Sequence, residues 1–223
     1  MTPQTAVFAD RRDAGRRLAL ALEFLRGQDP LVLALPRGGV PVGFEVARAL
    51  GAELDILLVR KIGAPGHEEY GLGAVVDGSN PQVIFNDDVM RDVAPSADYV
   101  EEEIRRQLKE IERRRSAYLG NRPPSSPTDR NVVLVDDGIA TGGTIRAALR
   151  ALRSLRPRRL IVAVPVAPPD VLVSLRREAD DVICLQSPPN FRAVGLHYDD
   201  FSQIGDEEVV SLLSAAQPGR RTG

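Results

Sequence analysis

The sequence predicts an α/β fold, with a mostly parallel twisted sheet flanked by helices. Short apolar runs rich in β-branched residues alternate with longer amphipathic segments along most of the chain. This alternation is typical of buried parallel strands connected by helices. The chain has 223 residues, of which 43% are hydrophobic, and this is enough for one good-sized domain with an ordinary core.

The first part of the chain contains a strand–helix–strand pattern. An amphipathic helix over Asp10–Leu25 precedes an apolar strand at Leu31–Leu35, and Pro41 suits the first turn of a further helix. A second buried strand follows, and this order predicts a right-handed parallel crossover. The expected elements are a tight loop at Pro36–Gly39, a helix at Pro41–Leu50 and a strand at Leu54–Val59.

The middle of the chain is more polar. Ile62–Tyr70 contains Gly63, Pro65 and Gly66, and this composition predicts a mobile loop. The elements expected after it are a hairpin of Leu72–Val76 and Gln82–Phe85, a long charged helix over Ser96–Tyr118 capped by Ser96, and a surface connection at Arg122–Asp129.

The last part of the chain returns to alternating strands and helices. Val132–Val135 is apolar and mostly β-branched, which suits a strand buried on both faces of a parallel sheet. A helix reaching to about Leu155 is expected to follow it. The remaining predicted elements are strands at Leu160–Val164 and Asp181–Leu185, helices at Pro169–Arg177 and Asp206–Ala215, and a disordered tail at Gln217–Gly223.

Charge and composition exclude several classes of function. The 29 basic and 31 acidic residues give a formal net charge of −2, which argues against bulk binding of nucleic acid. The single cysteine, Cys184, lies in an apolar run and is expected in the core, and with two histidines a structural zinc site is not expected. Because we find no signal peptide and no membrane-spanning apolar stretch, a soluble cytoplasmic protein is expected.

The most informative segment follows the strand Val132–Val135. Asp136 and Asp137 emerge at its carboxyl end, where open α/β sheets place their ligands. Two carboxylates there can accept hydrogen bonds from vicinal hydroxyls and can lie near a hydrated Mg²⁺. Ala140–Thr144 lies where a helix begins, so backbone N–H groups can hold a phosphate. Two glycines allow a close approach and two hydroxyls add donors: Gly142, Gly143, Thr141 and Thr144. Together these groups predict a ribose phosphate site.

This segment resembles the phosphoribosyl-pyrophosphate signature of type I phosphoribosyltransferases. The absence of a Lys after the glycines and of G-x-G-x-x-G argues against other nucleotide motifs. The resemblance covers most of residues 30–205. It implies transfer of a phosphoribosyl group from phosphoribosyl pyrophosphate to a nitrogenous acceptor, with release of pyrophosphate. It also implies that Asp136 and Asp137 hold the ribose diol, that Ala140–Thr144 binds phosphate, and that Asp136, Asp137 and Asp199 ligate Mg²⁺.

A second segment, Leu35–Gly39, resembles the pyrophosphate loop of the same family. It places the Arg37 guanidinium and two glycines, Gly38 and Gly39, at the carboxyl end of a strand. By this resemblance the three residues bind the substrate. The family often has a cis peptide at this place, and the corresponding bond is Pro36–Arg37. A plain glycine turn with a surface arginine is the alternative.

Two basic residues, Arg60 and Lys61, follow the second predicted strand. In the family, a basic residue at this point meets pyrophosphate, so the resemblance assigns Arg60 to substrate binding and Lys61 to catalysis. A lysine at a strand end can equally extend into solvent. The Ile62–Tyr70 loop would then close over the site and exclude water. His67 in this loop could transfer a proton, although a lone histidine in a loop is more often solvated.

A third segment, Asn190–Phe201, resembles the hood of hypoxanthine-type purine phosphoribosyltransferases. Val194 with its neighbouring glycine, and Asp199, match the family pattern. The aromatic residue that stacks on the base does not, because Arg192 stands at its position and Phe191 is one residue early. Either residue could stack on a base. Phe191, Tyr198 and Phe201 could alternatively form the core of the hood.

Two departures weaken the assignment of a 6-oxopurine acceptor. Hypoxanthine-type enzymes have an aspartate in the phosphate turn, where this chain has Ala140. They also present a lysine from the next strand, whereas Ile161–Val166 carries no charged group. The sequence therefore indicates phosphoribosyl pyrophosphate and leaves the acceptor open, with a nucleobase as the expected class.

We expect one domain over residues 1–223. Its core would span about 30–185, its hood about 1–29 and 186–205, and a helical insertion about 77–128. By resemblance a homo-oligomer such as a dimer is expected. One alternative is a non-catalytic or weakly catalytic nucleotide sensor that binds RNA through Arg105, Arg106 and Arg113–Arg115, although these residues alternate with glutamates. A non-catalytic structural or partner-binding domain is another alternative, and it would not bind phosphoribosyl pyrophosphate.

Overall fold

A computed structural model describes residues 7–78 and 80–216. Over these residues a five-stranded sheet forms in the order β2-β1-β6-β7-β8, and every neighbouring pair is parallel. The predicted fold class, a mostly parallel sheet flanked by helices, is therefore confirmed. The strands are β1 (Pro30–Ala34), β2 (Glu53–Ile56), β6 (Asn131–Val135), β7 (Arg159–Val166) and β8 (Asp181–Gln186).

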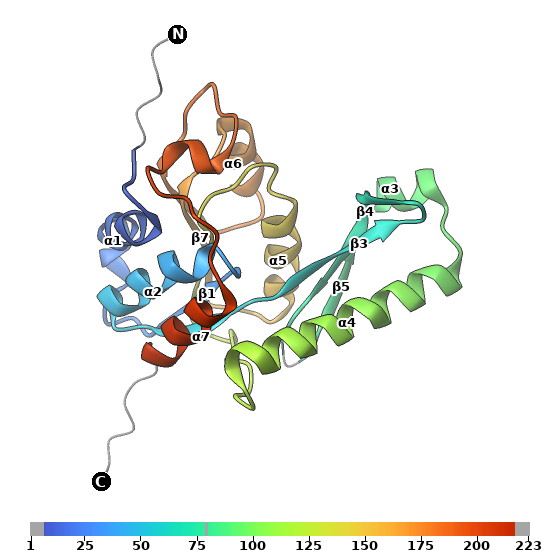
Figure 1. The fold of residues 1–223 in the computed structure, drawn as a ribbon, viewed down its shortest axis with the longest axis horizontal. Coiled ribbons are helices and arrows are strands. Elements are labelled where there is room, and N and C mark those ends of the chain that lie inside the picture. Colours follow the sequence, from blue (N-terminus) through green and yellow to red (C-terminus); the bar gives the residue numbers. More distant parts are fainter. Residues whose placement is uncertain (1–6, 79, 217–223) are drawn as a thin grey trace.

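Different helices cover the two faces of the parallel sheet (Figure 1). Val32 and Val133 are buried against α1, α2 and α7, whereas Leu31 and Leu134 are buried against α5 and α6. Neighbouring strand residues point to opposite faces, so the strands are apolar at every position and not at alternate ones. The helices are α1 (Arg11–Ala21), α2 (Gly39–Leu50), α5 (Gly143–Ser154), α6 (Pro169–Leu175) and α7 (Asp206–Ala215).

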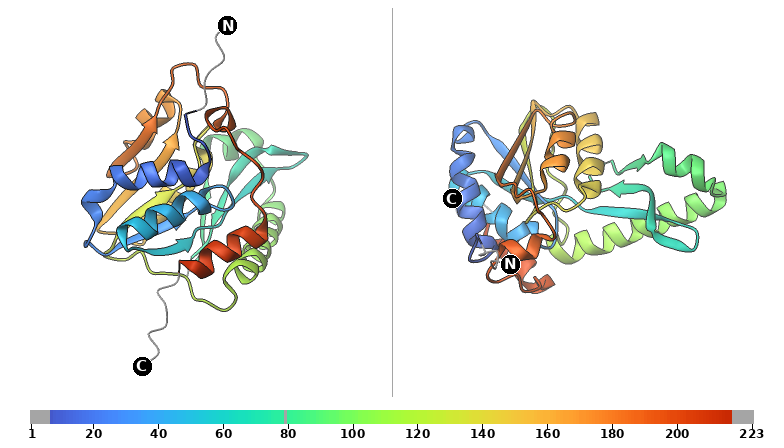
Figure 2. Two further views of the ribbon diagram at one scale, coloured as in Figure 1. Left: turned by 60° about the vertical axis from the view of Figure 1, so that its left-hand side comes forward. Right: turned by 90° about the horizontal axis from the view of Figure 1, so that it is seen from above.

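A lobe formed by residues 59–119 extends to one side of this body (Figures 1 and 2). Within the described residues it contains a three-stranded antiparallel sheet in the order β3-β4-β5. The predicted hairpin is confirmed by β4 and β5, and the predicted Ser96 cap accepts a hydrogen bond from the Tyr99 N–H. The elements of the lobe are β3 (Val59–Ala64), β4 (His67–Val76), β5 (Gln82–Phe85), α3 (Asp87–Val93) and α4 (Ala97–Leu119).

Two predictions for the start of this lobe are wrong. Ile62–Tyr70 is not a loop, because most of it belongs to the β3–β4 hairpin, which turns at Pro65 and Gly66. Arg60 and Lys61 lie within β3 and not at the end of β2. The apolar run continues from β2 into β3, so the sequence does not show where one sheet ends and the other begins. The hairpin is polar, and without its pairing partner such a segment has the composition of a loop. The helix α3 was also not predicted.

A buried cluster of charged residues joins the lobe to the parallel sheet. The Arg115 guanidinium, on α4, contacts the carboxylate of Asp55 on β2 (3.2 Å) and that of Asp77 after β4 (2.7 Å). Arg122 contacts Asp55 as well (2.9 Å), and the Ser125 N–H donates to it (2.8 Å). These bonds connect α4 and the end of β4 to the parallel sheet.

The predicted hood assembles from the two ends of the described chain. Val7 and Phe8 donate backbone hydrogen bonds to the His197 carbonyl, and the Asp199 N–H donates to the Phe8 carbonyl. The Tyr198 ring lies 5.4 Å from that of Phe8 and 5.1 Å from that of Phe201. Of the three rings in the alternative hood core, Tyr198 and Phe201 therefore pack together, whereas Phe191 packs on His197. Short 3-10 helices occur at Glu23–Leu25 and Val194–His197.

In the C-terminal region, the prediction of a helix before the tail is confirmed, and the prediction of a core position for Cys184 is wrong. The α7 helix has the predicted bounds, Asp206–Ala215. Cys184 is half-buried on β8 and not fully buried, because β8 is an edge strand. The predicted tail at Gln217–Gly223 lies outside the described residues. Within residues 7–78 and 80–216, no helix combines the length and the apolar character that crossing a membrane requires.

Candidate active site

Two of the predicted loops meet at the carboxyl edge of the parallel sheet. β1 and β6 pair in register, with Ala34 opposite Val135, so the chain leaves both strands at the same level. The residues after β1 form the Pro36–Gly39 loop, and those after β6 are Asp136 and Asp137. The sheet therefore brings these segments side by side, although almost 100 residues separate them in the chain.

The two glycines of the Pro36–Gly39 loop allow it to lie directly on the carboxylates. A Cβ added to Gly38 would lie 2.0 Å from Asp137 Oδ2, and one added to Gly39 would lie 2.8 Å from the Val135 carbonyl oxygen. Only glycine fits at both places. The Pro36–Arg37 peptide bond is cis, as the family resemblance implied.

The two adjacent carboxyl groups are half-buried. Burial raises the pKa of Asp136, and the neighbouring charge of Asp137 raises it further. Burial also raises the pKa of Asp137, although the hydrogen bond and the charge of Arg11 oppose this effect. Two carboxylates with one nearby guanidinium are not fully compensated, so a cation or hydroxyl donors would stabilise their ionised forms.

Arg11 is a site residue that the sequence did not indicate. It is the first residue of α1 and is 8% exposed, and its Nε donates to Asp137 Oδ2 over 2.7 Å. The Tyr198 hydroxyl donates to the backbone carbonyl of Asp137 from the hood side (2.5 Å). The sequence pattern predicted only an amphipathic helix here, and a paired arginine at a helix start carries no local signal of its long-range partner.

The turn at Ala140–Thr144, for which the sequence predicts phosphate binding, leads into α5. Gly142 has a positive φ of 77°, which favours glycine, and α5 begins at Gly143. The first N–H groups of a helix have no acceptor within that helix, so they face outward from the turn. Four of the turn residues that the sequence singled out are exposed to solvent: Ala140, Thr141, Gly143 and Thr144.

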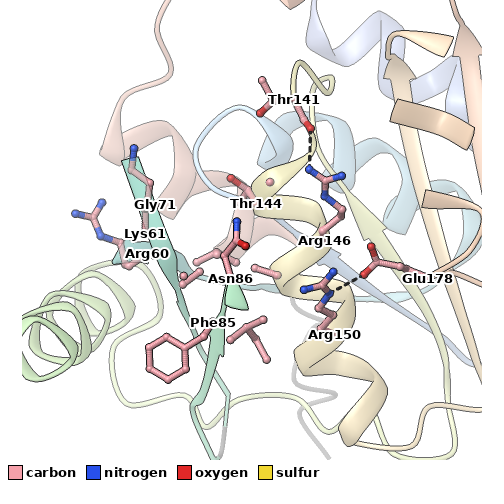
Figure 3. Close-up of a pocket in the computed structure, with 16 residues that line it drawn as sticks. Arg60, Lys61, Gly71, Phe85, Asn86, Thr141, Thr144, Arg146, Arg150 and Glu178 are labelled. Atoms are coloured by element: carbon pink, nitrogen blue, oxygen red, sulfur yellow. Dashed lines mark hydrogen bonds and ion pairs between the residues drawn. The ribbon is translucent and has the colours of Figure 1, made fainter. Parts of the chain in front are cut away.

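A cavity of about 900 Å³ lies between the antiparallel sheet and α5, beside the phosphate turn (Figure 3). Lys61 and Arg60 line it from β3, although Arg60 Nε also donates to Gln107 on α4 (3.0 Å). Arg146, one turn into α5, donates weakly to the Thr141 carbonyl (3.4 Å). The cavity thus carries several cationic groups next to the turn. Lys61 is one of them, although it lies within β3 and not at the end of β2.

The hood packs closely on the strand end that carries the carboxylates. A Cβ added to Gly138 would lie 2.5 Å from Val194 Cγ1, so the predicted hood valine lies directly over this turn. Phe191 stacks on His197 with ring centroids 5.6 Å apart, and its ring therefore has a protein partner. Burial lowers the pKa of His197. Asp199 is exposed.

Mg²⁺ is the metal that the resemblance implies. Among the residues that the structure describes, no three His, Cys, Asp or Glu side chains come together to hold a metal ion, so Asp199 does not join the aspartate pair. Mg²⁺ is commonly held by one or two carboxylates together with water and substrate phosphates. The uncompensated pair Asp136 and Asp137 fits this kind of site.

Arg37 lies beside the aspartates but is partly engaged elsewhere. Its guanidinium approaches the Asp206 carboxylate at the start of α7 (3.8 Å), and Asp206 accepts a hydrogen bond from the Tyr118 hydroxyl (2.7 Å). A second cavity, of about 370 Å³, is lined by Arg37, Arg11 and Asp137. Both guanidinium groups therefore face the same small space next to the carboxylates.

The arginines that could have formed an RNA-binding surface on α4 are mostly paired with carboxylates. Arg113 and Arg114 both contact Glu110 (2.8 and 2.7 Å), and Arg106 contacts Glu103 (2.8 Å). Arg115 belongs to the buried cluster with Asp55 and Asp77. This arrangement is that of a salt-bridged helix face and leaves little uncompensated positive charge.

Comparison with known families gives one match over most of the chain. The sequence profile described as "Phosphoribosyl transferase domain" matches residues 9–200. Two curated Mycobacterium tuberculosis proteins, MT0597 from strain CDC 1551 and Rv0571c from strain H37Rv, are provisionally named phosphoribosyl transferases. Each is 44% identical over 210 residues. The match covers 94% of this chain but 47% of each relative, so the chain spans about half their length.

The fold also matches a solved structure. The crystal structure of the protein TT1426 from Thermus thermophilus is 46% identical in sequence, with a TM-score of 0.80. The match covers 92% of this chain and 97% of that one. The described elements therefore form a fold that a related protein also adopts.

Proposed function

Because the chain belongs to the phosphoribosyl transferase domain family, we propose that it transfers the 5-phosphoribosyl group from phosphoribosyl pyrophosphate to a nitrogenous acceptor, with release of pyrophosphate. The observation that carries the proposal is the packing of Gly38 against the Asp137 carboxylate. It brings the proposed diol-binding pair together with the proposed pyrophosphate loop at one edge of the sheet, and the proposed phosphate turn begins a few residues further along the chain. We propose a homo-oligomer such as a dimer as the assembly.

In the proposed reaction the chain binds both ends of the donor. Asp136 and Asp137 accept hydrogen bonds from the ribose hydroxyls and stabilise positive charge that develops at the anomeric carbon. The N–H groups and hydroxyls of Thr141–Thr144 bind the 5-phosphate. Arg37 and Lys61 bind the leaving pyrophosphate, with Arg60 nearby. Mg²⁺ bound at Asp136 and Asp137 would neutralise charge on the pyrophosphate oxygens.

We propose that the acceptor binds at the hood. Val194 packs on Gly138 and could shape the base site, and Phe191 could present the ring face that His197 does not cover. Asp199 is exposed and could contact polar groups of the acceptor. Because Ala140 cannot exchange a proton with the acceptor, we propose a nucleobase that needs no acid at this position of the turn.

The most direct test is a screen for pyrophosphate release with magnesium and phosphoribosyl pyrophosphate. The panel is adenine, hypoxanthine, guanine, xanthine, uracil and orotate, each with the purified chain. We expect release with at least one base and none without a base. Isothermal titration calorimetry with phosphoribosyl pyrophosphate provides the binding measurement. If the chain binds no phosphoribosyl pyrophosphate, the proposed function is wrong.

A sensor that binds phosphoribosyl pyrophosphate without transferring it is the second candidate. Two features favour it: Ala140 supplies no acid in the turn, and Asp137 is already bonded to Arg11. Tight binding of phosphoribosyl pyrophosphate with no pyrophosphate release for any base of the panel would support this role. Salt-dependent retention of RNA that is lost on replacing Arg113 and Arg114 would add the RNA-binding function.

A further inference from the structure

The hood determines where α1 begins and therefore where Arg11 lies. Phe8 pairs with Tyr198 in an isolated bridge, and the Asp200 N–H donates to the Ala9 carbonyl (2.9 Å). The Asp10 side chain then caps α1 by accepting a hydrogen bond from the Asp13 N–H (2.7 Å). This local structure places Arg11 at the first position of the helix, facing the carboxyl edge of the sheet.

Arg11 is held on three sides. Its Nε donates to Asp137 Oδ2 (2.7 Å), and its NH1 group donates to the Ser202 carbonyl (2.8 Å). Its guanidinium carbon lies 3.8 Å from the centre of the Phe201 ring. A planar guanidinium can satisfy these contacts together, because it stacks on a ring with its face while it donates from its edge.

Asp137 Oδ2 is confined between Arg11 and Gly38, as the position of an added Gly38 Cβ demonstrates. We propose that Arg11 is a positioning residue, which orients the Asp137 carboxylate for the ribose diol and couples this orientation to the hood. This inference rests on the proposed function, since it assumes that Asp137 binds the diol. Arg11 acts through Asp137 and does not contact the reacting atoms.

The neighbouring arginine shows that this arrangement is specific to one position. Arg12 is also in the first turn of α1, but its guanidinium contacts Glu45 at 3.6 Å and is largely exposed. It lies over the Phe44 ring at 5.7 Å, on the side of α2. Arg12→Ala therefore removes the same chemical group from the same helix turn without touching Asp137, and it serves as the matched control.

The experiment compares two sugar phosphates that differ at the diol. Ribose 5-phosphate has the 2-hydroxyl, and 2-deoxyribose 5-phosphate lacks it. The affinity of each is measured by calorimetry without magnesium for the parent chain and for Arg11→Ala, Arg11→Lys, Phe201→Leu and Arg12→Ala. The ratio of the two affinities reports the diol contact, while a general loss of folding would lower both affinities together.

We expect the parent chain to prefer ribose 5-phosphate and Arg11→Ala to reduce this preference by about tenfold, as is typical for residues that orient a ligand-binding group. Arg11→Lys should restore part of the preference, since it keeps a donor but loses the planar stack. Phe201→Leu should lose part of the preference for ribose 5-phosphate, and Arg12→Ala should retain all of it. With phosphoribosyl pyrophosphate, Arg11→Ala should raise KM and also lower kcat, because a misplaced Asp137 carboxylate stabilises the developing positive charge less well.

The outcomes separate this inference from the proposed function. If the parent chain does not distinguish the two sugar phosphates, the diol-binding role of the aspartates is wrong. If the parent distinguishes them and Arg11→Ala does so equally well, only the role of Arg11 is overturned. If Arg11→Ala fails to fold, unchanged preference in both Arg11→Lys and Phe201→Leu overturns it instead.

Discussion

Two clusters of aspartate and arginine, one around the buried Asp55 and one around the half-buried Asp136 and Asp137, lie in different regions of this molecule. At the base of the lobe, Asp55 is bonded to two guanidinium groups, those of Arg115 and Arg122, and to two backbone N–H groups. At the edge of the sheet, Arg11 is bonded to Asp137, and Asp136 accepts a hydrogen bond from the Asp137 N–H. Asp55 therefore has hydrogen-bond donors for both of its carboxylate oxygens, whereas the aspartate pair has fewer donors than its carboxylate oxygens can accept.

The pKa values of the two clusters move in opposite directions. Burial acts to raise the pKa of Asp55, but the Ser125 N–H, the two arginines and the Ile56 N–H outweigh it and lower the pKa. For Asp136 and Asp137 burial prevails, and the pKa of each is raised. The comparison is consistent with a stabilising role for the Asp55 cluster, and it supports the proposal that the aspartate pair binds a ligand.

Removing both charges of the aspartate pair should give the largest functional effect. In Asp136→Asn combined with Asp137→Asn, we expect pyrophosphate release to fall by about a thousandfold or more, because the charge that stabilises the developing cation is lost. Thermal unfolding should occur at the same or a higher temperature, since two poorly compensated charges are no longer buried. Unchanged affinity for phosphoribosyl pyrophosphate would show that the site is elsewhere.

The same kind of change in the lobe cluster should have the opposite effect on stability. In Asp55→Ala the free energy of unfolding should fall by about 3 kcal/mol, because Arg115 and Arg122 are left without their shared carboxylate. Urea denaturation monitored by circular dichroism measures this. Glu53→Ala, on the same strand but at a more exposed ion pair with Arg130, should change stability by less than about 1 kcal/mol. Equal losses in both variants would contradict the comparison.

A smaller effect is expected from filling the space between the Pro36–Gly39 loop and the aspartates. Gly38→Ala should lower stability by about 2 kcal/mol and displace the Asp137 carboxylate, since its Cβ would lie 2.0 Å from Oδ2. Gly205→Ala is the control, because an added Cβ there meets no atom within 4 Å. Calorimetry with phosphoribosyl pyrophosphate should detect weaker binding in the first variant only. If both variants bind alike, the loop does not determine the position of the carboxylate.

The lowered pKa of Asp55 gives a pH dependence with a defined sign. Its stabilising contribution is fully present above the unfolded-state pKa of about 3.9 and is lost as the pH falls through the lower folded-state pKa. The parent chain should therefore lose stability below about pH 4 more steeply than Asp55→Asn does. Urea denaturation of both proteins at several acidic pH values measures the difference. Parallel curves would mean that Asp55 does not titrate with folding.

The sequence predicted the sheet well because the determinants of its strands are local. Val132–Val135 is apolar at every position, and this pattern by itself indicates a strand covered on both faces. The β3–β4 hairpin was mistaken for a loop because its strand character depends on pairing that a single segment does not reveal. Where β3 begins is equally hidden, since Leu57 and Leu58 continue the apolar run of β2 into it.

The candidate site likewise contains residues that the sequence can indicate and residues that it cannot. Asp136, Asp137 and the Pro36–Gly39 loop could be found from the sequence because each belongs to a short ordered motif at a strand end. Arg11 could not, because its partner is 126 positions away and the hood alone determines their meeting. The fit of Gly38 against Asp137 is likewise a property of the assembled sheet edge.

The smallest expected effect concerns Glu110 on α4, which combines two arginine partners with a partly exposed side chain (26%). Hydrogen bonds from Arg113 and Arg114 lower the pKa of Glu110 to about 2, so by this measure it resembles Asp55. Solvent and salt screen the pair, however, so Arg113→Ala with Arg114→Ala should change the free energy of unfolding by less than about 1 kcal/mol. Urea denaturation at low and high salt tests this. A loss approaching that of Asp55→Ala would mean that the number of partners, and not burial, determines what an aspartate or glutamate contributes.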